Sequence, residues 1–298
     1  RRFSLLFHGL SGAEIPSGVH YPIAFGIAGS LRTLGELSLR DGDIDQAISQ
    51  FQRALNFLNE LNRGRGYDFY VTEALAGLGR VYTSAGDHVR ALVVLNSARQ
   101  TATGEQIPNV LNSLGYLYME QEDYAQADAQ FRQTLKIYRD AKNQRGESRV
   151  LINLGVVQQR QGNHEEALTL FRQSLDAATA TKVVEVEIAA LEGIGVVMTA
   201  QSRFDDALKF LNKGLVIARE SQDKTRQTEL LWRTAQTYEQ MHDYARAEQF
   251  AQDAVALASA MHLLKLSFLA TATLGDVYAA NNKVELAIRT FKDAFDQL

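Results

Sequence analysis

The sequence contains no cysteine, which excludes disulfides, thiolate metal ligands and a cysteine nucleophile from its 298 residues. This absence fits a reducing compartment, although many exported proteins also lack cysteine; the location we expect is cytoplasmic. The sequence also lacks an excess of positive charge: its formal net charge is −4, and without a broad basic footprint we expect no nucleic-acid partner. A long uncharged apolar run is missing as well. The most apolar stretch, residues 183–200, is interrupted by three glutamates, so we expect no membrane span.

Catalytic and metal-binding patterns are missing too. None of the six histidines lies four residues from another, the spacing that lets two imidazoles on one helix face share a metal ion. The pair Gly77 and Gly79 neither follows a strand nor continues to a third glycine, so it is not a dinucleotide fingerprint. Adjacent carboxylates such as Glu165 and Glu166 stand at expected helix starts, where the helix dipole favours them. We therefore expect no catalytic residue, no metal site, no cofactor and no enzyme activity.

What the sequence does contain is a repeat. Seven alanines recur at one phase, and twelve residues before each stands a glycine or, once, another alanine. The successive spacings are 44, 36, 40, 40, 40 and 40 residues. A unit of about 40 residues cannot bury its apolar face alone, so stacked units must share a core, which predicts one elongated repeat domain. The alanines are Ala47, Ala91, Ala127, Ala167, Ala207, Ala247 and Ala287, and the small residues before them are Gly35, Gly79, Gly115, Gly155, Gly195, Ala235 and Gly275.

Each unit has the pattern of two amphipathic helices joined by a tight turn. Around Gly155, apolar and small residues recur at three- and four-residue intervals on both sides of Gly162 and Asn163. Asp or Asn in the turn is expected to cap the second helix, and glycine before it to end the first. Glycine inside a helix costs about 1 kcal/mol relative to alanine, so its recurrence predicts a close helix approach, with Gly155 admitting Ala167. Equivalent turns are expected at Gly42-Asp43, Gly86-Asp87, Glu122-Asp123 and His242-Asp243.

The pattern Leu-Gly-x2-Tyr followed by Ala-x3-Phe resembles the tetratricopeptide repeat. The resemblance covers about residues 23 to 298 and implies an all-α, right-handed α-solenoid of seven helix-turn-helix units. The period is longer than the family's usual value of about 34 residues and is similar to that of kinesin light chains, spindle-orientation scaffolds and large bacterial regulators. The best units carry Leu78, Gly79, Tyr82 and Ala91; Leu114, Gly115, Tyr118, Ala127 and Phe131; and Leu274, Gly275, Tyr278, Ala287 and Phe291.

A narrower resemblance concerns the segments 218–223 and 274–278, which are similar to bacterial tetratricopeptide regions that precede a CHAT domain, a caspase-like protease module. It implies the sensor or regulatory part of such a protein, without the protease. The chain begins at Arg1 and stops within an amphipathic helical pattern, so we expect a fragment of a longer protein.

The expected domain organisation has two parts. Residues 1–22 form a lead or cap segment, where several glycines and Pro16 interrupt any long helix, and residues 23–298 form the solenoid. A longer loop is expected at 63–66, where the first spacing exceeds the period by four residues. The seven units are expected near 28–71, 72–107, 108–147, 148–187, 188–227, 228–267 and 268–298.

The resemblance also implies a ligand site, because in this family the first helix of each pair lines a concave groove that commonly holds an extended peptide. Residues six before, two before, one after and five after each key glycine share that face. An asparagine amide both donates and accepts, which suits Asn112 and Asn153 to a peptide backbone, and arginines suit acidic groups. The predicted groove residues are Arg80, Asn112, Tyr116, Arg149, Asn153, Val156, Arg160, Val196, Trp232, Arg233 and Gln236.

The fifth unit's stripe is small and apolar, with Ala189, Gly193, Val196 and Ala200. It predicts either a pocket for a bulky apolar ligand residue or simply closer packing of adjacent units at Gly193. We expect a non-catalytic protein-interaction scaffold with a protein or peptide partner. The alternative is a structural, self-assembling solenoid that forms homo-oligomers through its ends.

Overall fold

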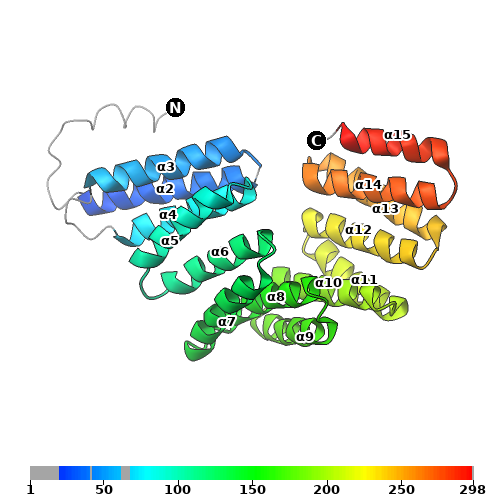
Figure 1. Cartoon of the computed structure of the whole chain (residues 1–298), viewed down its shortest axis with the longest axis horizontal. Helices are drawn as coiled ribbons and strands as arrows, with labels where there is room; N and C mark the ends of the chain where they lie inside the picture. Colours follow the sequence, from blue (N-terminus) through cyan, green and yellow to red (C-terminus); the bar gives the residue numbers. More distant parts are fainter. Residues whose placement is uncertain (1–19, 41, 62–67, 297–298) are drawn as a thin grey trace. The chain divides into compact units, whose positions relative to one another are not determined.

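The computed structural model describes residues 20–40, 42–61 and 68–296, and within them the chain folds as fourteen helices without a β-strand (Figure 1). From α4 onwards, short described segments join each helix to the next. The helices are α2 His20–Arg40, α3 Ile44–Leu61, α4 Asp68–Ser84, α5 His88–Thr101, α6 Gln106–Glu120, α7 Tyr124–Asp140, α8 Gln144–Arg160, α9 His164–Thr181, α10 Val184–Ala200, α11 Phe204–Glu220, α12 Lys224–Gln240, α13 Tyr244–Ala260, α14 Leu264–Ala280 and α15 Val284–Phe295.

Successive helices form seven pairs along the chain, each with an even-numbered first helix and an odd-numbered second helix. The second to seventh pairs begin two to four residues before the expected unit bounds, because each first helix starts directly after its turn. The expected lead segment 1–22 lies outside the described residues except for its last three, which open α2. The loop expected at 63–66 also lies outside them.

The turns within pairs share one conformation. Gly86 has a positive φ of 73°, and the side chain of Asp87 then accepts a hydrogen bond from the backbone N–H of Arg90 at 3.0 Å. This caps α5 by satisfying one of the free N–H groups in its first turn. The expected turns at Gly42, Glu122 and His242 also have a positive φ, between 60° and 81°, and are followed by the capping residues Asp43, Asp123 and Asp243.

The turn before α9 departs from the expectation. Gly162 has the positive φ, but the side chain of Asn163 does not cap the helix. Its amide instead donates to Oε1 of Gln158 at 2.8 Å. The prediction that Asn163 caps the second helix is therefore wrong, because a polar side chain on the preceding helix competes for the asparagine amide.

Phenylalanines on the second helices join one pair to the next. Phe171 of α9 is fully buried, and its ring lies against Gly155 of α8 and Gly193 of α10. A Cβ atom at either glycine would come within 2.6 Å of the ring. Gly155 thus makes room for the ring of Phe171; the expected close approach of Ala167 stays a prediction. Gly193 has the packing role that was one of its two predicted roles. Phe51 is likewise held between Gly35 of α2 and Gly77 of α4.

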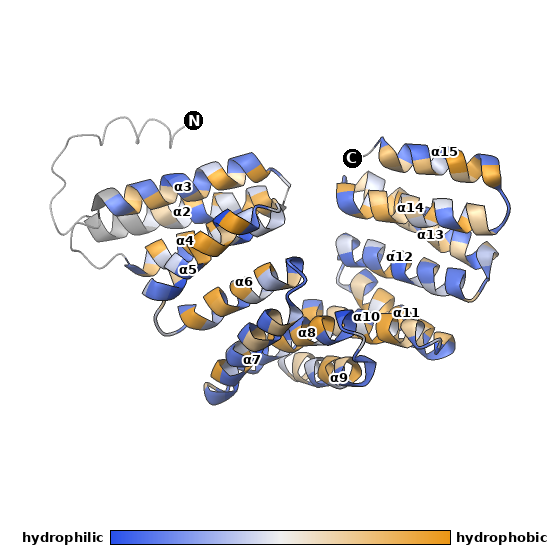
Figure 2. Cartoon of the chain, in the orientation of Figure 1, coloured by the Kyte–Doolittle hydropathy of each residue, from blue (hydrophilic) through white to orange (hydrophobic). Residues whose placement is uncertain are grey.

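The first helices also contact one another in sequence: α2 with α4, α4 with α6, α8 with α10, α10 with α12 and α12 with α14. Second helices α3, α5, α9, α11 and α13 each pack on their own first helix and on the next one. The coloured parts of the helices mix hydrophobic and hydrophilic residues (Figure 2), as expected for helices buried on part of their surface. Contacts restricted to neighbours define a repeat solenoid, so the predicted all-α solenoid is confirmed.

The chain divides into two compact parts, Arg1–Gln130 and Phe131–Leu298. We call them the N-terminal body and the C-terminal body. The division falls inside α7.

Replacing Gly193 with alanine is expected to destabilise the fold. The added Cβ would lie 2.6 Å from the Phe171 ring, which Gly155 confines on its other side. Overpacking of this kind costs about 1–3 kcal/mol, more than the ~1 kcal/mol that alanine contributes through helix propensity. Gly26→Ala in α2 is the control, because nothing lies within 4 Å of its Cβ position. Thermal unfolding should show a lower Tm for Gly193→Ala alone; an unchanged Tm would contradict the packing role.

Candidate functional site

The predicted groove residues all lie on first helices, but they divide between the two bodies. Arg80 on α4 and Asn112 and Tyr116 on α6 belong to the N-terminal body. The other eight lie on α8, α10 and α12 of the C-terminal body. Each body therefore presents its own candidate surface.

The C-terminal body has a hollow of about 440 Å³ between α8, α10 and α12, which we call the α10 hollow. Part of its lining is apolar and half-buried, with Ile152 and Val156 from α8 and Ala189 and Val196 from α10. The rest is polar or charged. Because Gly193 also lines it, the small residues of α10 serve both the hollow and the packing against Phe171. The polar lining residues are Gln159, Arg160, Glu192, Arg226 and Arg233.

Four predicted residues line this hollow: Val156, Arg160, Val196 and Arg233. Sequence reasoning missed Ile152, Gln159, Glu192 and Arg226. Arg226 had a usable signal, since it precedes Arg233 by seven residues and so lies on the same helix face two turns earlier. The other three lie outside the predicted stripe, and only the fold brings them to the hollow.

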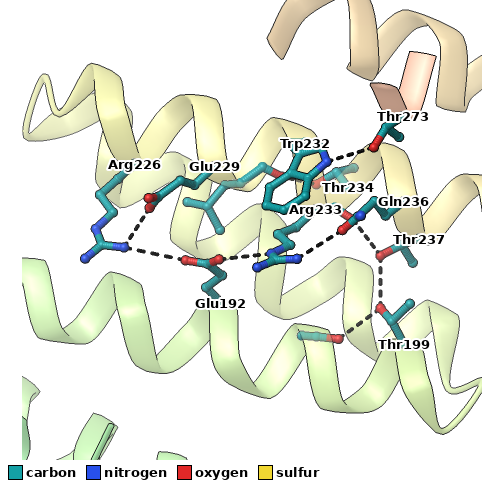
Figure 3. A network of polar contacts seen from close by, with 12 residues as sticks. Glu192, Thr199, Arg226, Glu229, Trp232, Arg233, Thr234, Gln236, Thr237 and Thr273 are labelled. Atoms are coloured by element: carbon teal, nitrogen blue, oxygen red, sulfur yellow. Dashed lines mark hydrogen bonds and ion pairs between the residues drawn. The ribbon is translucent and has the colours of Figure 1, made fainter. Parts of the chain in front are cut away.

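Glu192 of α10 links two arginines of α12 (Figure 3). One carboxylate oxygen lies 3.2 Å from Nε of Arg233, and the other lies 3.7 Å from Nη1 of Arg226. Arg226 also pairs with Glu229 at 2.6 Å, and Arg233 donates from Nη1 to Oε1 of Gln236 at 3.1 Å. The four charged side chains are only 15–33% exposed, so salt screens these pairs less than it screens surface pairs.

Trp232 supports this network from within the fold. Its side chain is buried, and its Nε1 donates to Oγ1 of Thr273 at 2.9 Å (Figure 3). The guanidinium of Arg233 lies over the indole, 4.0 Å from the ring centroid, a favourable cation–π geometry. Trp232 therefore lies beneath Arg233 and orients its guanidinium, and its place among the groove residues stays a prediction.

Burial and neighbouring charges shift the pKa values of this network in opposite directions. Burial raises the pKa of Glu229 even though Arg226 opposes the shift. Burial lowers the pKa of Arg226, but the carboxylates of Glu229 and Glu192 raise it by more, so the net shift is upward. Arg226 is thus a permanent cation beside the α10 hollow.

Two other predicted residues of α8 differ in accessibility. Arg149 forms an ion pair with Glu185 of α10 at 2.7 Å, and both side chains are more than half exposed. A pair this exposed adds little stability, so an incoming charged group displaces it at small cost. Asn153, in contrast, is only 7% exposed, and little of its amide is open to a peptide.

The first helices of the N-terminal body are also tied by ion pairs. Nη2 of Arg80 lies 3.5 Å from Glu36 of α2, and Arg32 of α2 lies 3.8 Å from Glu73 of α4. A hollow of about 360 Å³ lies between α2, α4 and α6, and the half-exposed ring of Phe69 contributes to its lining. Arg80, Asn112 and Tyr116 do not line it.

The described residues contain neither a cluster of metal-ligating side chains nor a helix suited to a membrane. Histidines, aspartates and glutamates nowhere gather in a group of three that could hold a metal ion. None of the described helices combines the length and the apolar character that crossing a bilayer requires.

The tetratricopeptide repeat family model matches residues 106–180 and 187–260, which together make up half of the chain. The chain belongs to the tetratricopeptide repeat family. Among curated proteins, no sequence matches this tetratricopeptide repeat chain significantly.

Solved structures share the fold at low sequence identity. A Rap protein complexed with Competence and Sporulation Factor has a TM-score of 0.69 at 14% identity, covering 91% of this chain and 76% of its own. The Rap conjugation gene regulator of plasmid pLS20, in complex with the Phr* peptide, scores 0.70 at 15% identity and covers 96% and 79%. A STAND protein with a tetratricopeptide repeat sensor, PH0952 from Pyrococcus horikoshii, scores 0.64 at 15% identity and covers 90% and 41%.

In this tetratricopeptide repeat chain, Arg149→Gln is expected to return the pKa of Glu185 towards its ordinary value. The hydrogen bond from Arg149 holds that pKa below its usual range. The pair therefore stabilises the fold above the ordinary glutamate pKa, and this stabilisation is lost as the pH falls through the lowered value. Because both side chains are exposed, the loss of stability should stay below about 1 kcal/mol. An NMR pH titration of the Glu185 carboxyl measures the shift, with Arg172→Gln as the charge-matched control; a Glu185 pKa indifferent to Arg149→Gln would refute the pairing.

Proposed function

We propose that this chain is a non-catalytic scaffold that binds a peptide or a protein segment on its first helices, with the α10 hollow as the principal contact. The observation that carries the proposal is the hollow itself. Its apolar lining is only half-buried by the chain's own side chains, while its charged lining is held in place by ion pairs between helices. Apolar concavities with a few fixed polar groups are the usual form of a recognition site.

Structural neighbours support the choice of partner. The pLS20 regulator, which has the same fold over 96% of this chain, is described in complex with the Phr* peptide. A solenoid of first helices offers an extended peptide several equivalent contact points, one for each pair. The proposed site residues in this chain are Arg149, Val156, Arg160, Val196, Arg233 and Gln236, with Asn153 and Trp232 acting from below the surface; Arg80, Asn112 and Tyr116 remain the proposed contacts of the N-terminal body.

We further propose a regulatory setting for this scaffold, as the sensor part of a larger bacterial protein with a C-terminal CHAT protease. The resemblance of segments 218–223 and 274–278 to such proteins supports this, and so does the neighbour that is described as carrying a tetratricopeptide repeat sensor. The coding sequence downstream tests the proposal: a His-Cys protease module there supports it, and a different domain refutes it.

Selection from a phage-displayed dodecapeptide library tests the binding function. Wild-type protein should enrich specific sequences, and Val196→Asp should weaken binding of the enriched peptides about tenfold, because it removes an apolar contact worth roughly 1.5 kcal/mol. Val216→Asp on α11 is the matched control, since Val216 is exposed and lies outside the hollow.

Circular dichroism establishes that both variants stay folded, and Val196→Thr repeats the comparison without a charge. Absence of any enriched peptide, or equal loss of binding in the Val196→Asp and Val216→Asp variants, would refute the proposed function.

A second candidate function, self-assembly through the solenoid end, is favoured by the surface of α15. Val284, Ile288 and Phe295 are 59%, 66% and 73% exposed, and Phe291 is 40% exposed although its counterpart Phe171 is fully buried. The positions 284, 288 and 295 share one helix face. An apolar face of this kind marks an interaction surface when it is contiguous.

Self-association through α15 predicts a sedimentation coefficient that rises with protein concentration. Ile288→Glu should abolish the rise by placing a charge on the apolar face. Val89→Glu on α5 serves as the control, because Val89 is 77% exposed, against 66% for Ile288, but lies on a different helix. A sedimentation coefficient constant across concentrations removes this candidate.

A further inference from the structure

The α10 hollow carries more positive than negative charge. Three arginines line it, and Glu192 is the only carboxylate in its described lining. Both oxygens of Glu192 are engaged, one by Arg226 and one by Arg233, and Glu229 supplies Arg226 with a second partner. Two of the three arginines are therefore already neutralised by two carboxylates of the chain.

Arg160 is the remaining cation. It stands exposed at the end of α8 and forms no ion pair or hydrogen bond with any residue that the structure describes. All five of its N–H donors are available, in the planar arrangement that fits a carboxylate. It follows Val156 by four residues, so the two side chains are neighbours on one face of α8, with Cβ atoms about 6 Å apart.

That separation matches an extended peptide. Side chains of an extended chain alternate between its two sides, and residues i and i+2 lie on the same side about 6.6 Å apart. An apolar residue resting on Val156 and Val196 thus places the side chain two positions away beside Arg160. A peptide residue directly adjacent to the apolar one would point away from α8.

We propose that the α10 hollow selects an extended segment in which a bulky apolar residue and an Asp or Glu stand two positions apart. The apolar side chain packs on Val156 and Val196, and the carboxylate pairs with Arg160. This proposal rests on the proposed function and specifies the chemistry of its partner. Glu192 adds a second selection, because it occupies Arg226 and Arg233 and so disfavours a ligand with a further acidic residue beside the apolar one.

The same dodecapeptide library tests the proposal. Wild-type protein should enrich an apolar residue with an acid two positions away, in either order along the peptide, over the same pair placed side by side. Arg160→Gln should keep the apolar preference and lose the acidic one. Arg172→Gln is the matched control, because Arg172 is also exposed and unpaired within the described residues but lies on α9 outside the hollow.

Synthetic peptides then measure the contact. Replacing the acidic residue of an enriched peptide with its amide should weaken binding to wild type about fivefold to tenfold, and should have no effect on binding to the Arg160→Gln variant. Glu192→Gln should strengthen binding of a peptide with a second acid while leaving the single-acid peptide almost unchanged.

The outcomes separate the two proposals. Enriched peptides without an acid, with the acid adjacent to the apolar residue, or with an acid preference that survives in Arg160→Gln overturn this inference and leave the scaffold function standing. A library from which nothing is enriched refutes the scaffold function itself.

Discussion

The contact on which the rest of the structure depends is a phenylalanine ring held between two glycines of successive first helices. Phe171 lies against Gly155 and Gly193, and Phe51 lies against Gly35 and Gly77. Each glycine lowers the helix propensity of its position, and the close approach of the phenylalanine ring that it permits offsets this loss. The ring fixes the distance between neighbouring first helices. The same spacing leaves the α10 hollow between α8, α10 and α12.

Within each body, charge as well as packing organises the first helices. Ion pairs join α2 to α4, α8 to α10 and α10 to α12. Those around Glu192 are largely shielded from solvent, whereas the pair between Arg149 and Glu185 is exposed. The first helices of the C-terminal body thus carry both shielded and exposed ion pairs, and a peptide of the proposed kind would displace only the exposed pair at small cost.

The repeat could be predicted from the sequence alone, because its phase and period are visible in the recurrence of single residues such as Ala167 and Gly155. Helix caps depend on residues close in sequence, so the cap at Asp87 could be predicted. The predicted cap at Asn163 was wrong because a side chain on the previous helix competes for the asparagine amide. Contacts across repeats could not be predicted. Glu192 and Arg233 are 41 residues apart, and their pairing depends on rotamers and on the packing angle of two helices.

Nearest-neighbour packing has a consequence for how the molecule comes apart. In a linear array, each helix pair is held by its neighbours alone. Phe171 joins the pair α8 and α9 to α10, whereas α12, α13 and α14 pack on one another without it. Loosening the Phe171 contact should therefore open one junction between pairs while the following pairs keep their own packing.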